Sequence, residues 1–439
     1  MNITVVGTGY VGLVSGTCLA EIGHSVTCVD IDEDKIKRLE KGEIPIFEPG
    51  LDALVLSNVR VGRLKFTTSL PDVIDKTDVI VIAVGTPSRP DGHADLQYVY
   101  AVAEQIGQNL KKYTAIVNKS TVPVGTGKEV EDIIRKNYSG EFSVVSCPEF
   151  LREGSAVEDF MKPDRVVIGA RDDRAAQVLL EVFKGIRGEK LVTTVESAEL
   201  IKYASNAFLA TKISFINEIA QICERAGADI EEVAYGIGLD SRIGPRFLKA
   251  GIGWGGSCFP KDVEALDQMA GMYGYDFKLL SAVIEVNNDQ RKHFVAKVME
   301  HFEGKLTGKK IAILGLAFKG NTDDIRESAA VDIVRMFAEN GADVSAFDYE
   351  ATKNAQRALE GVAVRYAEDP YDCVNGADVV VIATEWPQFI ELDWAKVARL
   401  VANPVIFDGR NLFQPERMRE HGLTYISIGR NGEFGDQKS

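Results

Sequence analysis

A glycine-rich turn near the start of the chain constrains the fold more than any other feature. The β-branched run 3–6 leads directly into Gly7-Thr-Gly-Tyr-Val-Gly12, and residues 13–22 continue in a pattern compatible with a helix. Residues 26–29 predict the next strand, which ends at Asp30, 18 residues after Gly12. Strand, glycine turn, helix, strand and carboxylate in this order are the fingerprint of a dinucleotide-binding unit. The chain therefore begins with a Rossmann-like α/β domain.

The same turn predicts the cofactor. Glycine at positions 7, 9 and 12 lets backbone N–H groups approach a pyrophosphate, and Asp30 is placed to hold the ribose hydroxyls. Because a carboxylate there repels the 2′-phosphate of NADP, the sequence favours NAD.

Polar residues follow three further strand-like runs. Residues 78–84, 115–119 and 144–145 have the apolar composition of parallel strands covered on both faces. Ligands collect beyond the carboxyl ends of such strands, so the residues that follow them are candidates for one crevice. Each alone would equally fit an exposed polar loop. The candidates are Thr86, Thr121, Glu149 and Glu153.

The middle of the chain is helical. Residues 197–227 predict about eight helical turns that are apolar almost all round, and residues 278–302 predict a second long helix. A helix this apolar needs cover on several sides, which favours pairing with a second copy of the chain. Lys202 and Asn206, four residues apart, project from one face of the first long helix.

A second α/β region repeats the order of the first. Strand-like runs at 309–315, 342–348 and 377–384 predict another doubly wound parallel sheet. Phe318 and Lys319 fill its degenerate glycine turn, which favours a nucleotide other than NAD. We therefore expect two Rossmann-like domains, 1–196 and 304–439, joined by a helical domain at 197–303, with a frayed tail after residue 428.

Composition narrows the classes of function. Fifty Lys and Arg against 65 Asp and Glu give a net charge of −15, which argues against a general nucleic-acid or membrane-surface binder. The six cysteines include no C-x-x-C pair, so we expect free thiols and no metal site. Without a signal-peptide pattern or a membrane-length apolar run, the sequence predicts a soluble cytoplasmic protein.

The segment Gly251-Ile-Gly-Trp-Gly-Gly-Ser-Cys-Phe-Pro-Lys-Asp262 predicts the chemistry. Pro260 suits the first position of a helix, which places Cys258 just outside the helix and Asp262 in its first turn. The helix dipole and Lys261 favour the thiolate, the form that attacks carbonyl carbon. The alternative is that Cys258 is a small packed hydrophobic residue.

Taken together, the motifs resemble those of the UDP-glucose 6-dehydrogenases, within the superfamily of nucleotide-sugar dehydrogenases. The resemblance covers essentially the full length. It implies one Rossmann-like domain for NAD, one for the nucleotide of the substrate, and a helical core that forms a homodimer. Besides the first glycine turn, it rests on Ser120-Thr-Val-Pro-Val-Gly125, Pro148-Glu-Phe-Leu-Arg-Glu-Gly154, Lys202-Tyr-Ala-Ser-Asn206, Gly255-Gly-Ser-Cys-Phe-Pro-Lys-Asp262, and Ala317-Phe-Lys319 with Arg326-Glu-Ser328.

The resemblance also implies a reaction. The C6 alcohol of UDP-glucose is oxidised twice to give UDP-glucuronate, a product of the kind used in polysaccharide biosynthesis, and two NAD are reduced. Cys258 traps the aldehyde as a thiohemiacetal, whose oxidation gives a thioester that water cleaves. Lys202 stabilises oxyanion charge, and Asp262 with a water near Thr121 handles protons. Glu149 and Glu153 assist at the hydrolysis or cofactor end, and Asn206 holds an oxygen.

The resemblance further assigns binding residues. The expected cofactor-binding residues are Gly7, Gly9, Tyr10, Val11, Gly12, Asp30, Lys35, Thr86, Thr121, Glu153 and Arg326. The expected substrate-binding residues are Glu149, Phe150, Leu151, Arg152, Glu153, Lys202, Asn206, Phe247, Leu248, Lys249, Ala250, Gly251, Gly255, Phe318, Lys319 and Arg410, with Arg242 reaching in from the partner subunit.

Three alternatives stay open. GDP-mannose and UDP-N-acetylmannosamine dehydrogenases share the cysteine chemistry, and Phe259 only mildly favours UDP-glucose. A two-electron hydroxyacid dehydrogenase also pairs a helix lysine with an asparagine four residues on, but it gives Cys258 and the second nucleotide domain no role. A catalytically silent NAD-binding scaffold leaves Cys258, Lys202 and Asp262 together unexplained.

Overall fold

The computed structural model describes residues 1–430, which pack into two compact units. The first comprises residues 1–205 and 264–275, and the second comprises residues 206–263 and 276–430. The three-domain division at 196 and 303 stays a prediction. In the described part of the chain, no helix is both long and apolar enough to cross a membrane.

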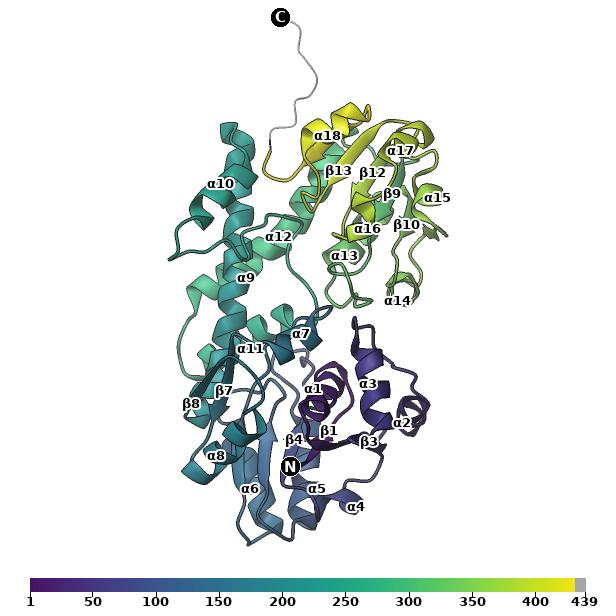
Figure 1. Cartoon of the computed structure of the whole chain (residues 1–439). Coiled ribbons are helices and arrows are strands. Elements are labelled where there is room, and N and C mark those ends of the chain that lie inside the picture. The colour runs from purple at the N-terminus through teal and green to yellow at the C-terminus, as the bar shows by residue number, and fades with distance from the viewer. Residues whose placement is uncertain (431–439) are drawn as a thin grey trace, which may run out of the picture. The chain divides into compact units, whose positions relative to one another are not determined.

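Among the described residues, the first unit holds an eight-stranded sheet in the order β3-β2-β1-β4-β5-β6-β7-β8 (Figure 1). The first six strands are parallel, in the order of a dinucleotide-binding sheet. Strand β7 pairs antiparallel to β6, so β7 and β8 run in the opposite direction. The strands are β1 (Asn2–Val6), β2 (Ser25–Val29), β3 (Leu64–Thr67), β4 (Val79–Ile82), β5 (Ala115–Asn118), β6 (Ser143–Ser146), β7 (Arg165–Gly169) and β8 (Glu189–Thr193).

Helices cover both faces of this sheet because alternate residues of each central strand are buried on opposite sides. Val79 and Val81 of β4 pack in one core with α1, α3, α7 and α8, whereas Ile80 and Ile82 pack in another with α5 and α6. The helices are α1 (Tyr10–Glu21), α2 (Glu33–Glu40), α3 (Leu51–Arg60), α4 (Pro71–Ile74), α5 (Gln97–Asn109), α6 (Thr126–Asn137), α7 (Ala156–Met161) and α8 (Asp173–Val182).

Within the same described range, the second unit holds a six-stranded parallel sheet in the order β11-β10-β9-β12-β13-β14. This order matches that of the first six strands of the other sheet, so the prediction of two Rossmann-like domains is confirmed. The strands are β9 (Lys310–Leu314), β10 (Asp343–Phe347), β11 (Val364–Tyr366), β12 (Val379–Ile382), β13 (Val405–Asp408) and β14 (Thr424–Ser427). The short helices around this sheet are α13 (Ala329–Glu339), α14 (Thr352–Ala358), α15 (Pro370–Val374), α16 (Pro387–Ile390), α17 (Trp394–Leu400) and α18 (Pro415–Glu420).

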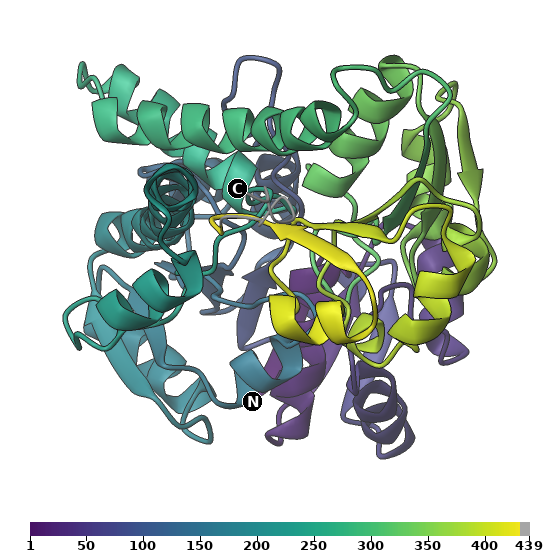
Figure 2. The same cartoon turned by 90° about the horizontal axis from the view of Figure 1, so that it is seen from above.

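Four further helices complete the chain: α9 (Val195–Ala226), α10 (Ile230–Gly238), α11 (Phe259–Met272) and α12 (Lys278–His301). Helix α9 begins in the first unit and continues into the second. In the second unit, Ala220 of α9 and Phe294 of α12 belong to the same core as the sheet, and α12 packs against α13 (Figure 2). Both long helices predicted from the sequence are therefore present.

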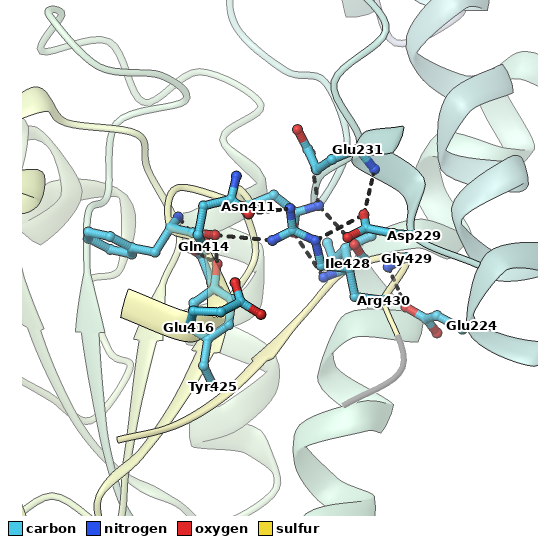
Figure 3. Close-up of polar contacts among 12 residues, drawn as sticks. Glu224, Asp229, Glu231, Asn411, Gln414, Glu416, Tyr425, Ile428, Gly429 and Arg430 are labelled. Atoms are coloured by element: carbon cyan, nitrogen blue, oxygen red, sulfur yellow. Dashed lines mark hydrogen bonds and ion pairs between the residues drawn. The ribbon is translucent and has the colours of Figure 1, made fainter. Parts of the chain in front are cut away.

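The end of the described chain is anchored, so the predicted fraying after residue 428 is wrong for Gly429 and Arg430 (Figure 3). The Gly429 N–H donates to Glu224 at 2.8 Å, and the Gly429 C=O accepts from the Ile230 N–H at 2.9 Å. Arg430 donates to Asp229 at 3.1 Å. Residues 431–439, the rest of the predicted tail, lie outside the described residues.

Candidate active site

The first glycine turn has room for a ligand only where the fingerprint requires it. Gly7 has φ +100°, and a Cβ there would lie 2.6 Å from the Ala83 carbonyl oxygen. A Cβ on Gly12 would lie 1.9 Å from the Gly7 carbonyl oxygen, whereas a Cβ on Gly9 would meet nothing within 4 Å. Gly9 is also the N-cap of α1, and because glycine has no side chain to bond the first N–H groups of the helix, those groups can receive a pyrophosphate. The turn therefore fits a dinucleotide.

Asp30 stands directly after β2, where the ribose hydroxyls of NAD are expected. Its Oδ2 accepts from the Thr8 N–H at 2.9 Å, the Thr8 hydroxyl at 2.6 Å and Lys35 Nζ at 3.1 Å. Burial opposes ionisation, but the hydrogen bonds from Thr8, Asp32 and Lys35 lower the pKa of Asp30. The lowered pKa favours the ionised carboxylate, and the structure brings the predicted residues Asp30 and Lys35 together.

A small pocket in the first unit lies at the carboxyl ends of β5 and β6. Thr121, predicted as catalytic, lines it, and the Thr121 C=O accepts from the Thr86 hydroxyl at 3.0 Å. Asn118 contributes a fully buried amide that has no hydrogen-bond partner in the described structure. The pocket is lined by Asn118, Ser120, Thr121, Val122, Ser146, Pro148, Glu199 and Lys202. These polar groups give the sheet edge the character of a binding site.

Lys202 and Glu149 form a buried ion pair within the first unit. Lys202 Nζ lies 2.8 Å from Glu149 Oε1, and each side chain is only 4% exposed. Burial by itself raises the pKa of Glu149, but the charge and hydrogen bond of Lys202, together with the Leu151 N–H, lower it. Lys202 is therefore a buried, paired lysine, and its role in stabilising oxyanion charge stays a prediction.

Two buried glutamates that the sequence did not single out hold these loops. Glu199, one helical turn before Lys202 on α9, accepts from the N–H groups of Gly125 and Gly127, both at 2.8 Å. Glu48 accepts from the Gly154 and Ala156 N–H groups, both at 2.7 Å. The spacing of Glu199 from Lys202, on the same face of an apolar helix, was a usable signal, whereas nothing in the sequence distinguishes Glu48 from a surface glutamate.

Cys258 lies at the N-terminus of α11 in the second unit. The helix begins at Phe259, one residue before the start at Pro260 that the sequence predicts. The Cys258 C=O accepts the first hydrogen bond of the helix, from the Asp262 N–H at 2.9 Å. Of the six cysteines, all described, Cys258 is half-buried and the other five are buried. A thiol at a helix N-terminus is placed where the thiolate is favoured.

Asp262 is held in a fixed orientation beside this helix start. Its Oδ2 accepts from Asn206 Nδ2 and its Oδ1 from Lys261 Nζ, both at 2.6 Å, and the residue is 1% exposed. The predicted residues Asp262 and Asn206 are thus in direct contact. A buried carboxylate with one charged and one neutral donor can accept a proton during a reaction.

The turn after β9 in the second sheet differs from a dinucleotide turn, as the sequence indicated. Asp348, the counterpart of Asp30, accepts from the Leu316 N–H at 2.6 Å, as Asp30 does from the Thr8 N–H. Asp348 also accepts from the Ala317 N–H at 3.0 Å, which removes this second donor from a pyrophosphate. Arg410, after β13, donates to the C=O groups of Phe318 at 3.0 Å and Ala383 at 2.9 Å. Lys319 Nζ lies 5.4 Å from the centre of the Phe318 ring. Phe318, Lys319 and Arg410 therefore gather at one sheet edge.

The remaining predicted substrate residues lie on loops. Phe247 has φ +65°, which is strained for a non-glycine residue and is typical of functional loops. It begins the run to Gly251, in which Leu248 and Ala250 are buried and Lys249 is exposed. Arg242 is exposed and pairs with Asp240 of its own chain at 2.6 Å.

The binding roles of several predicted residues stay predictions. In the first unit these are Val11, Glu153, Phe150, Leu151 and Arg152; Lys202 Nζ lies 5.6 Å from the centre of the Phe150 ring, and Arg152 pairs with Asp159 at 2.6 Å. In the second unit Arg326, expected near the cofactor, pairs with Asp324 at 2.7 Å. Lys202, Glu149 and Thr121 belong to the first unit, and Cys258, Asp262 and Asn206 to the second, so the assembly of the six into one catalytic set stays a prediction.

A dinucleotide turn on one parallel sheet, and a second parallel sheet of the same order with a different turn, define the class of protein, a two-sheet dinucleotide-binding α/β protein. Comparison with known proteins agrees. Three models of the UDP-glucose/GDP-mannose dehydrogenase family match: the NAD binding domain at residues 1–187, the central domain at 196–289 and the UDP binding domain at 312–415.

Full-length relatives are also similar. A UDP-glucose 6-dehydrogenase of Bacillus subtilis is 54% identical over the whole chain and 95% of its own length. The solved UDP-glucose dehydrogenase of Pyrobaculum islandicum is 42% identical with a TM-score of 0.91 over 98% of both chains. The solved UDP-D-ManNAc dehydrogenase of Pyrococcus horikoshii is 26% identical with a TM-score of 0.86, over 98% of this chain and all of that one. The chain belongs to the UDP-glucose/GDP-mannose dehydrogenase family, and its cofactor is NAD.

Proposed function

We propose that this chain is a UDP-glucose 6-dehydrogenase that oxidises C6 of UDP-glucose twice and forms UDP-glucuronate. The observation that carries the proposal is that the Cys258 segment is built into the edge of the second sheet. A Cβ on Gly256 would lie 2.7 Å from the Phe318 ring, and Arg410 donates to the Gly253 C=O at 3.3 Å. A sugar attached to a nucleotide at this edge can therefore reach the thiol.

The residues of the chain supply proton transfer, charge and a covalent anchor. Bound NAD supplies the hydride acceptor for both oxidations. Asp262 takes the proton of the C6 hydroxyl as the alcohol becomes an aldehyde. The Cys258 thiolate then adds to the aldehyde carbon, and the ammonium group of Lys202 stabilises the negative charge that develops on oxygen.

The resulting thiohemiacetal again carries a C–H bond and an O–H bond, so loss of a second hydride and proton gives a thioester. Water adds to the thioester carbonyl, the C–S bond breaks, and the carboxylate product leaves while the thiolate is regenerated. Ionised Glu149 keeps Lys202 charged and in place through these steps. A half-exposed thiol that must stay reduced suits the cytoplasm, where we place the reaction.

We also propose a homodimer that pairs through α9. Phe208, Phe215 and Ile222 are spaced by seven residues on this helix and are 65%, 52% and 58% exposed, so they form one apolar stripe. A second copy related by two-fold symmetry buries the same stripe from the other side. Arg242, exposed on the loop between α10 and α11, then serves the partner's substrate.

The substrate is tested by comparing turnover on UDP-glucose, GDP-mannose and UDP-N-acetylmannosamine at equal concentrations, with NADH counted against the sugar acid formed. The proposal predicts a clear preference for UDP-glucose and two NADH per uronate. A preference for either other sugar would reassign the substrate within the family, and one NADH per sugar would favour a two-electron dehydrogenase.

A further inference from the structure

The segment that leads to Cys258 is buried although it is not regular secondary structure. Gly251, Ile252, Gly253 and Trp254 are all buried, and Trp254 is 7% exposed. Buried N–H and C=O groups need hydrogen-bond partners, which in this segment cannot come from a helix or a ladder of its own. Residues 251–257 are here named the nucleophile loop.

Side chains of α9 and α12 supply those partners. The Gly251 N–H donates to Asn217 Oδ1 at 2.9 Å, and the Gly251 C=O accepts from Gln290 Nε2 at 2.9 Å. The Trp254 N–H donates to Asn287 Oδ1 at 2.8 Å, and the Trp254 C=O accepts from Asn287 Nδ2 at 3.0 Å. A single amide side chain therefore satisfies both the N–H and the C=O of Trp254, as the backbone of a neighbouring strand would.

The helix residues that make these bonds are themselves buried. Asn217 and Gln290 are 0% exposed, Asn287 is 2% exposed and Arg291 is 7% exposed. Arg291 donates a second hydrogen bond to the Trp254 C=O at 3.1 Å and another to the Glu327 C=O at 3.3 Å, and it pairs with Asp332. Burying polar side chains costs free energy unless they are hydrogen-bonded, so a hydrogen-bonded buried set is expected to fix one specific arrangement of the loop.

The opposite side of the nucleophile loop contacts the nucleotide edge of the second sheet. The Ile252 N–H donates to the Gly409 C=O at 3.0 Å, and the Gly256 N–H donates to the Arg326 C=O at 2.9 Å. A Cβ on Gly255 would lie 2.0 Å from the Glu327 carbonyl oxygen, so only glycine permits this approach. The loop is therefore enclosed between α12 and the sheet edge of its own unit.

We infer that Asn287, with Gln290 and Arg291, is a positioning residue for Cys258. A loop with four glycines has little stiffness of its own, so its geometry must be imposed by what surrounds it. The amide of Asn287 fixes Trp254, four residues before the nucleophile, and Arg291 ties the same carbonyl to the sheet-edge residue Glu327. The inference rests on the proposed function, in which Cys258 attacks the C6 aldehyde.

Asn287→Asp tests the inference with almost no change of shape. The carboxylate can still accept from the Trp254 N–H, but it cannot donate to the Trp254 C=O. We expect turnover of UDP-glucose to fall at least about tenfold, because small displacements of a reacting group are costly. The Michaelis constant for NAD should not change. The apparent pKa of Cys258, from the pH dependence of its alkylation by iodoacetamide, should rise by about 0.5 as its alignment with α11 loosens.

The matched control is Asn288→Asp, the same substitution at the next, exposed position of α12. It should keep the wild-type turnover and the wild-type apparent pKa of Cys258. If Asn287→Asp does not purify as a folded protein, Arg291→Lys decides, because lysine keeps the charge beside Asp332 but cannot span both carbonyls. We expect a smaller change of the same kind in both readouts.

Two failures can be told apart. If complete alkylation of Cys258 leaves wild-type turnover intact, the proposed chemistry fails whatever Asn287 does. If alkylation abolishes turnover but Asn287→Asp and Arg291→Lys both behave like Asn288→Asp, Cys258 is the nucleophile and the positioning role is overturned.

Discussion

Replacing Lys202 with methionine should destabilise the first unit by an amount that depends on pH. In the native protein Lys202 Nζ and Glu149 Oε1 lie 2.8 Å apart, with both side chains 4% exposed. Methionine keeps most of the volume but leaves the Glu149 carboxylate buried without its partner. Removing one member of a buried ion pair costs about 3–5 kcal/mol. For a unit of roughly 200 residues this lowers the midpoint of thermal unfolding by about 10 °C.

The sign of the pH dependence follows from the pKa of Glu149. In the native protein this pKa is lowered, so the stabilisation is fully present above the ordinary value of 4.5 and is lost as the pH falls through the native pKa. In Lys202→Met burial dominates and raises the pKa, so the variant loses stability as the pH rises through that raised value. The difference in stability between wild type and Lys202→Met should therefore be largest near neutral pH and decrease toward pH 4.

The assay is thermal unfolding of wild type and variant between pH 8 and pH 4, followed by circular dichroism. Lys128→Met is the matched control, since Lys128 pairs with Asp132 at 2.7 Å on the exposed face of α6, where solvent screens the pair. Its midpoint should stay close to that of wild type at every pH. If Lys202→Met matched this control, or if its deficit did not change with pH, the reasoning about the buried pair would be refuted.

Three further outcomes are expected. Asp30→Ala should raise the kcat/KM ratio for NADP over NAD by more than roughly tenfold, since a nearby charge no longer repels the 2′-phosphate, and an unchanged ratio would contradict this. Glu224→Gln should lower stability by about 2 kcal/mol. Burial raises the pKa of Glu224, but His293, Lys297 and the Gly429 N–H outweigh burial and lower this pKa to about 2. The loss of stability in Glu224→Gln should therefore be complete above pH 4.5 and vanish as the pH falls toward 2. Phe215→Glu should convert a dimer to a monomer in light scattering, and an unchanged mass would exclude α9 as the interface.

Local patterns in the sequence were sufficient for most of the architecture. The β-branched runs at 3–6 and 26–29 became β1 and β2, and the repeat of strand spacing after residue 309 became a second sheet with the same order. These patterns are visible because central parallel strands are apolar on both faces. The reversed direction of β7 and β8 was not visible, since Arg165–Gly169 has the composition of any other buried strand.

The candidate site was predicted where a motif carried it and missed where tertiary packing did. Asp30 and the glycines at 7, 9 and 12 are recognisable because the close-packed turn and its ligand together dictate their spacing. Asn287 and Arg291 were missed because polar residues on a helix suggest solvent. They nevertheless share a face with Phe294 and Val298, which are buried, and that spacing was the available signal. The sequence predicts a frayed tail at Gly429 because the residue that anchors it, Glu224, is distant in the sequence.

The most direct test of the account is the fate of UDP-glucose on Cys258→Ser, followed by intact-protein mass and by NADH counting with NAD present. The account predicts that the variant keeps its fold and NAD binding but loses overall turnover at least about a hundredfold, because a serine hydroxyl is barely ionised near neutral pH. Wild type should yield two NADH per sugar and lose activity on alkylation unless substrate protects it. If Cys258→Ser formed uronate at the wild-type rate, the covalent mechanism would be contradicted and Cys258 would be a packing residue only.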